Sequence, residues 1–217
     1  ERIDALRKFE DGQRELIMKG ARERAGDYLL AVHRKRNQPS TENFMLLADK
    51  GGLIPAVIHR WEGHLKLARR NNDPVWSLWH RLSELPDKGF EVAAANLIKA
   101  MAPVNEALNE KSADTAALVS VNRLVLSSIS ESPPKSMTDV STLYGALFKT
   151  VDQQWTEALK QAGSQRQPTA LSDQDAEALR QVLYGVGSPP MIPKQLGWGF
   201  LDLIPDRPTQ AEFKKLI

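Results

Sequence analysis

His59, Glu62 and His64 are the residues of this 217-residue chain whose types and spacing first suggest a metal site. Zinc hydrolases place two histidines four positions apart around a glutamate, so that both imidazoles lie on one helix face. Here the histidines are five positions apart, which separates them by roughly 140° around a helix. They cannot share one ion without a break in the helix, so we expect surface histidines and no metal site.

Trp76, Trp79 and His80 could form a platform on which a sugar ring or a base stacks. The same spacing is typical of a helix whose aromatic side chains fill a core, and packing is the favoured interpretation. Trp198 lies between two glycines in a stretch without helical rhythm. We therefore expect it to be more exposed than the other tryptophans, although a packing role is favoured for it as well.

Basic side chains gather towards the end of one predicted helix, at Arg60, Lys66, Arg69 and Arg70. They could bind phosphate or a sulfated polyanion, but basic residues also offset the dipole at a helix C-terminus. No nucleophile, base and acid stand at a diagnostic spacing, so we assign no catalytic residue, cofactor or metal ligand. The candidate ligand-binding residues are Trp76, Trp79, His80, Trp198, Arg60 and Arg69.

The composition is that of an ordinary globular protein, with 41% hydrophobic and 26% charged residues. There is no cysteine, which excludes disulfides, cysteine-ligated zinc and thiol nucleophiles. The net charge of +2 does not favour nucleic acid as a partner. No apolar run approaches the ~18 residues of a membrane span.

The stretch 73–85 predicts a buried central helix around which the others pack. Asp73 can cap it, Pro74 suits its first turn, and its apolar positions cover about half of the circumference. No alternating strand pattern is present. Helices are expected at 1–36, 41–50, 55–70, 73–85, 90–103, 104–109, 115–128, 136–163, 172–185 and 209–217.

The clearest helical periodicity runs from Val140 to Ala162 and is typical of a helical hairpin or a coiled coil. Its natural partner is 1–36, a helix that Gly12, Gly20 and Gly26 weaken, so that we expect a break or a kink in it. The chain is thus predicted to be one all-α module of about eight to ten helices, with a multi-helix globular body and a long amphipathic arm. Residues 164–171 are a predicted linker, and both chain ends are expected to interrupt a longer polypeptide.

Four stretches together resemble one protein family: Ala21–Ala31, Asp73–Leu82, Ser136–Leu159 and Leu179–Pro193. They are similar to the middle region of large planctomycete proteins that carry a cytochrome-c-like domain and two domains of unknown function. The resemblance implies a helical insert in a multidomain, exported or periplasmic protein linked to polysaccharide breakdown. After Gly185 this chain departs from the family's aspartate-rich segment, and it has no haem-binding Cys-x-x-Cys-His.

Three functions are compatible with these features. The first is a structural spacer and interaction module that positions flanking domains of the same polypeptide. The alternatives are a carbohydrate- or polyanion-binding module and a non-catalytic part of a polysaccharide-degrading enzyme. The expected partners are the flanking domains and, beyond them, another protein or a polysaccharide, with no nucleic acid and no membrane span.

Overall fold

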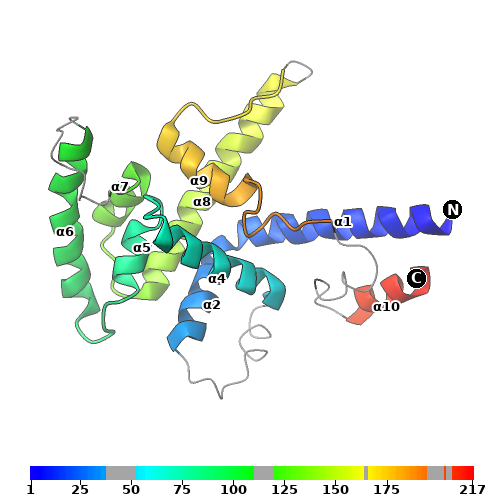
Figure 1. Ribbon diagram of the computed structural model, residues 1–217, viewed down its shortest axis with the longest axis horizontal. Coiled ribbons are helices and arrows are strands. Elements are labelled where there is room, and N and C mark those ends of the chain that lie inside the picture. Colours follow the sequence, from blue (N-terminus) through cyan, green and yellow to red (C-terminus); the bar gives the residue numbers. More distant parts are fainter. Residues whose placement is uncertain (38–51, 110–119, 164–165, 195–202, 204–206) are drawn as a thin grey trace.

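The computed structural model describes residues 1–37, 52–109, 120–163, 166–194, 203 and 207–217. Within these residues all regular structure is helical, which confirms the predicted all-α class (Figure 1). The predicted helix at 41–50 and Trp198 lie outside the described residues. The helices are α1 (Arg2–Glu23), α2 (Ala25–Asn37), α4 (Pro55–Arg70), α5 (Ser77–Leu82), α6 (Phe90–Asn109), α7 (Arg123–Glu131), α8 (Met137–Ala162), α9 (Gln174–Tyr184) and α10 (Arg207–Leu216).

Helix α8 runs through the body, and α2, α7 and α9 pack against it (Figure 1). It begins where the sequence predicts, because the Ser136 hydroxyl accepts the backbone N–H of Asp139 at 3.3 Å. Its buried side chains face more than one neighbouring helix, so it is a core helix, and its remaining positions are partly or fully exposed. The predicted arm formed with 1–36 is therefore not confirmed. The buried positions are Met137, Val140, Ser141, Tyr144, Phe148, Val151 and Trp155.

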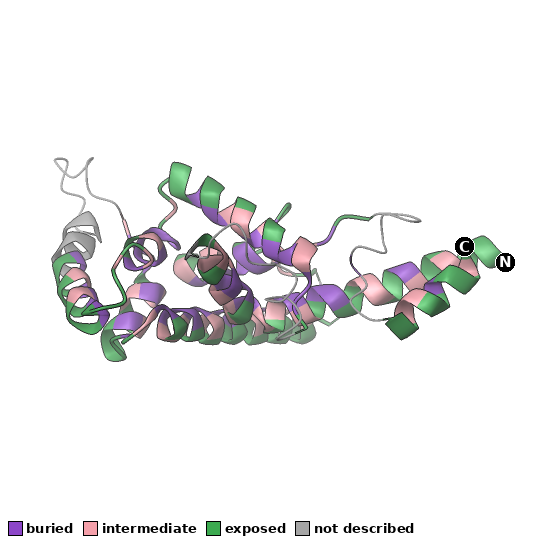
Figure 2. Ribbon diagram, turned by 90° about the horizontal axis from the view of Figure 1, so that it is seen from below, coloured by how far each residue is buried: buried purple, intermediate pink, exposed green. Residues whose placement is uncertain are grey.

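The N-terminal helix divides at Arg24 into α1 and α2, in agreement with the predicted break. Helix α2 turns into the body and packs on α8 and α4, whereas most of α1 projects away from it (Figures 1 and 2). There α1 pairs with α10, through the Phe9 and Phe213 rings at 6.1 Å. The partner of the projecting segment is therefore the C-terminal helix.

Helix α2 crosses α8 in close contact at Gly26 and Gly145. A Cβ atom on Gly26 would lie 2.7 Å from the Ser141 carbonyl oxygen and 3.2 Å from the Gly145 Cα. Both distances are shorter than ordinary van der Waals contacts, so the two backbones can approach this closely only without side chains. Gly26 weakens the N-terminal helix because glycine has a low helix propensity. It is nevertheless required here, since only glycine lets α2 pack this closely on α8.

The central helix predicted at 73–85 lies at the expected position and is buried as expected, but it is shorter than predicted. The regular helix α5 covers only Ser77–Leu82, since Asp73 and Pro74 form a turn in which the Asp73 carboxylate accepts the Val75 N–H at 2.9 Å. Similarly, α6 continues past Pro103, which was expected to end it. In α9 the cap is Asp173 and not the predicted Ser172. Local capping signals therefore locate these helices to within a few residues.

An aromatic cluster joins α4, α5 and α8 at the centre of the body. The rings of Trp76 and Tyr144 stack with 5.3 Å between centroids and 3° between planes. Trp61 meets Trp76 edge-on at 6.0 Å, and Phe148 contacts both indoles. The Tyr144 hydroxyl donates to the Val75 carbonyl at 2.8 Å, and burial raises its pKa far above that of an exposed tyrosine.

A second set of contacts fastens α9 to α8. The Arg180 guanidinium lies 4.2 Å from the centroid of the Trp155 ring and donates to Glu177 at 2.6 Å. These contacts cover the fourth described tryptophan, which is 8% exposed. No described helix has the length and apolar character that would let it cross a membrane.

The α2–α8 crossing predicts opposite effects for two glycine-to-alanine changes. Gly26→Ala should lower the free energy of unfolding by roughly 1–3 kcal/mol, because its methyl group has no room. Gly63→Ala, in α4 with nothing within 4 Å of its Cβ, should raise it by about 0.5–1 kcal/mol. Urea denaturation followed by circular dichroism measures both, and an equally stable Gly26→Ala variant would contradict the close crossing.

Candidate functional site

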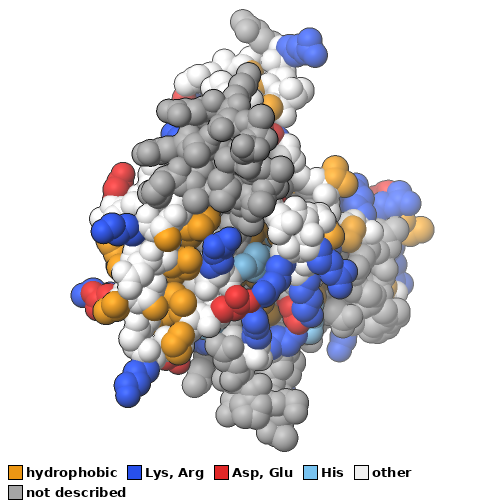
Figure 3. Space-filling view, turned by 60° about the vertical axis from the view of Figure 1, so that its left-hand side comes forward, with side chains coloured by type: hydrophobic (Ala, Val, Ile, Leu, Met, Phe, Trp, Pro, Cys, Tyr) orange, Lys and Arg blue, Asp and Glu red, His pale blue; other side chains and the backbone are white. Residues whose placement is uncertain are grey.

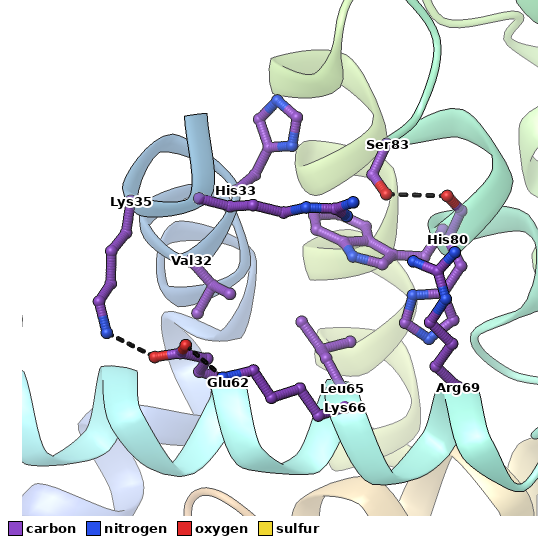
Figure 4. Close-up of a pocket in the computed structure, with 11 residues that line it drawn as sticks. Val32, His33, Lys35, Glu62, Leu65, Lys66, Arg69, His80 and Ser83 are labelled. Atoms are coloured by element: carbon purple, nitrogen blue, oxygen red, sulfur yellow. Dashed lines mark hydrogen bonds and ion pairs between the residues drawn. The ribbon is translucent and has the colours of Figure 1, made fainter. Parts of the chain in front are cut away.

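A pocket among the described residues lies between the end of α2, the second half of α4, and α5 (Figure 4). Its volume is about 400 Å³. Two of the three helices reach it with their C-terminal halves, where basic residues offset the helix dipole. The lining residues are Val32, His33, Lys35, Arg36, Glu62, Leu65, Lys66, Arg69, Trp79, His80 and Ser83.

The apolar part of the lining comes from all three helices. Val32 of α2 and Leu65 of α4 face each other across the pocket, and the Trp79 side chain of α5 adds to it. Only 3% of Trp79 is exposed, so the indole offers no open ring face. This arrangement suits a small apolar group but leaves no platform for a stacked sugar.

Glu62 is the carboxylate of the pocket, and two lysines hold it. Lys35 of α2 donates to one of its oxygens, and Lys66 donates to the other at 2.7 Å (Figure 4). These hydrogen bonds lower its pKa to about 2. The side chain is therefore ionised at neutral pH and occupied by its own neighbours, which makes it a poor general base.

Two arginines complete the charged part of the pocket. Arg69 of α4 pairs with Glu84, which lies beyond α5, and both side chains are about half exposed. Arg36, in the last turn of α2, forms no ion pair with any residue in the described part of the chain. Figure 3 shows one face of the molecule on which Lys and Arg side chains gather with a histidine and a few acidic groups.

His80 forms part of the pocket wall. Burial, assisted by the nearby Arg69, lowers its pKa to about 4. The imidazole is therefore neutral at pH 7, and its buried Nε2 atom has no hydrogen-bond partner among the described residues. The ring thus adds no charge to the several cations of the pocket.

The pocket brings together three of the six candidate ligand-binding residues, namely Trp79, His80 and Arg69. Trp76 is fully buried beneath them, and its indole N–H donates to the His64 Nε2 at 3.1 Å. Trp198 lies outside the described residues. The sixth residue, Arg60, lies elsewhere on α4.

Arg60 fastens the chain after α9 to the body. Its guanidinium donates to the backbone carbonyls of Ser188, Pro189 and Met191 at 2.7–2.9 Å. Three acceptors satisfy most of the guanidinium fork, so this side chain is engaged in holding backbone. The sequence alone could not separate this role from ligand binding.

His59 and His64 point to different surroundings, as their spacing predicts. His59 is exposed and lies close to Lys35 and Glu62, whereas His64 packs against Trp61 and Trp76. His64 is thus not a surface histidine, and its burial lowers its pKa. Among the described residues no group of three potential ligands could hold a metal ion.

Sequence reasoning missed the contribution of α2 to the pocket. His33, Lys35 and Arg36 come from a run of basic residues that looked like an ordinary solvated helix end. This basic run was the only sign in the sequence that the end of α2 could contribute to a binding site. That the run faces α4 and α5 follows only from the way α2 crosses α8.

Comparisons with known proteins do not extend this picture. Neither protein-family models, nor curated proteins, nor solved structures give a match to the chain. The resemblance to the planctomycete proteins therefore remains a prediction.

The environment of His80 predicts how stability depends on pH. An unfolded histidine titrates near 6.5, so between pH 6.5 and about 4 the unfolded chain binds a proton that folded His80 does not. Stability should therefore fall as the pH is lowered through this window, and His33 and His64 should add to the effect because their pKa values are also lowered. NMR titration of the histidine ring protons measures each group directly.

Substitution isolates the His80 contribution. His80→Gln should flatten the dependence of unfolding free energy on pH between 6.5 and 5, and His59→Gln, at an exposed position of α4, is the matched control. A His80 ring that titrates near 6.5 in the folded protein would contradict the burial of its charge.

Tryptophan burial predicts weak quenching by acrylamide. Trp198→Phe leaves four tryptophans, of which none is more than 8% exposed. Their fluorescence should be quenched several-fold less than that of the same variant unfolded in urea. Equal quenching in the two states would show that indole faces are open to solvent.

Proposed function

We propose that this chain is a non-catalytic helical module that positions the polypeptide on its two sides and serves as an interaction unit. The pairing of α1 with α10 is the observation that carries the proposal. It brings residues more than 200 positions apart in sequence to the same end of the molecule (Figures 1 and 2).

The contacts in this pair are specific. Phe213 of α10 is completely buried against α1, where its ring lies 6.1 Å from that of Phe9. The Arg2 side chain donates to the Leu216 carbonyl at 3.1 Å. Domains attached before α1 and after α10 would both begin at the same end of the molecule. The module would therefore hold these two domains next to each other.

The core chemistry supports a structural role over carbohydrate binding. Trp61, Trp76, Trp79 and Trp155 are all buried, and sugar stacking requires open indole faces. Within the pocket, Lys35 and Lys66 are both paired with Glu62. A role as a non-catalytic part of a polysaccharide-degrading enzyme is implied only by the family resemblance.

Energy transfer between the chain ends tests this function. Because the chain has no cysteine, Glu1→Cys and Ile217→Cys allow a donor and an acceptor dye to be attached specifically. We expect efficient transfer in this double variant, since Arg2 and Leu216 are in contact.

Two further changes show whether the α1–α10 pair is responsible. Phe213→Ser should reduce the transfer while leaving the circular dichroism of the body almost unchanged, because, among the described helices, α10 contacts mainly α1. Leu16→Ser, at a position of α1 that is 63% exposed, is the matched control and should have no effect. Weak transfer that Phe213→Ser does not alter would contradict the proposal.

A further inference from the structure

We propose that the pocket between α2, α4 and α5 binds a small organic anion, consisting of one ring and one carboxylate or phosphate group. Arg36 and Arg69 would receive the charged group, and the apolar lining would receive the ring. This binding activity is separate from the positioning role proposed above and does not depend on it.

The size of the pocket limits the ligand. Sites for drug-sized molecules typically have volumes of roughly 300–1,000 Å³, and this pocket, at about 400 Å³, is at the lower end of that range. Val32 and Leu65 face each other across it (Figure 4), and Trp79 also contributes to the lining. A single ring fits such a space, whereas an extended polysaccharide would need a longer groove.

The charge of the pocket selects an anion. Four basic side chains line it against the single carboxylate of Glu62. Lys35 and Lys66 are already bound to Glu62, which leaves the two arginines as the groups that can receive a ligand. A cationic ligand would face repulsion from both guanidinium groups.

The two arginines can change partners at little cost. The Arg69–Glu84 pair is about half exposed, and pairs of this kind contribute roughly 0–1 kcal/mol. Arg36 has no ion pair to break within the described part of the chain. Each guanidinium fork matches the geometry of a carboxylate or phosphate, so two forks from different helices can hold one anionic group.

His80 adds a side chain to the wall that carries no charge at pH 7. Its Nε2 atom is buried and has no hydrogen-bond partner among the described residues, although most buried polar atoms in proteins have one. The ring therefore contributes to the pocket without competing with the two arginines for the anionic group.

Benzoate and phenyl phosphate are the probes that test this inference, with benzyl alcohol as the neutral counterpart. Each is titrated into the ¹⁵N-labelled full chain, and amide and histidine shifts are followed by NMR. We expect saturable shifts that centre on α2, α4 and α5 for at least one anion. The alcohol should bind at least about fivefold more weakly, because it lacks the charge-assisted hydrogen bonds. The tighter of the two anions identifies the charged group.

Neighbouring arginines provide matched variants. Arg36→Gln and Arg69→Gln should each weaken binding by about fivefold or more, since each removes a guanidinium fork from the pocket. Arg34→Gln and Arg70→Gln change exposed positions of the same two helices that do not line the pocket, and should leave the affinity almost unchanged.

Three results would overturn the inference. The first is the absence of saturable shifts with both anions, and the second is equal binding of the alcohol. The third is an equal loss of affinity in all four arginine variants, which would indicate general attraction to a basic surface. If Arg69→Gln does not fold, Arg36→Gln and Arg34→Gln still provide the decisive pair.

Discussion

The contact between the backbones of α2 and α8 at Gly26 and Gly145 is the constraint on which the rest of the structure depends. No side chain separates the two helices there, and the Ser141 carbonyl occupies the space where a Cβ of residue 26 would lie. Packed interiors do not deform continuously, so this contact fixes the position of α2 on α8. This contact therefore also determines where the side chains of both helices lie in the body.

The same crossing connects the aromatic cluster to the pocket. From α8, Tyr144 stacks on Trp76 and so positions α5, which carries Trp79 and His80. From α2, the last turn brings Arg36 to the opposite wall. The pocket is thus a by-product of how three helices surround the core, and its charge comes from basic residues that also suit helix C-termini. A surface of this origin is compatible with both a structural role and ligand binding.

Local sequence signals predicted the helices better than their arrangement. Pro55 and Ser136 mark the starts of α4 and α8 because they act through backbone geometry and capping within a few residues. By contrast, Gly26 has a low helix propensity, and its need for close packing arises from a helix more than 100 residues away. The same distinction applies to the residues of the pocket. Arg69 and His80 were candidates from the sequence, whereas Arg36 became a candidate only when the position of α2 was known.

Hydrogen exchange of the backbone amides tests most directly whether the α2–α8 crossing holds the body together. Segments that open only when the whole protein unfolds exchange with the free energy of global unfolding. We predict this behaviour for the amides of α2 and α8 around Gly26 and Gly145, and faster exchange in the projecting first half of α1. Exchange in α2 as fast as in that part of α1 would show that the crossing opens independently, and would contradict this account.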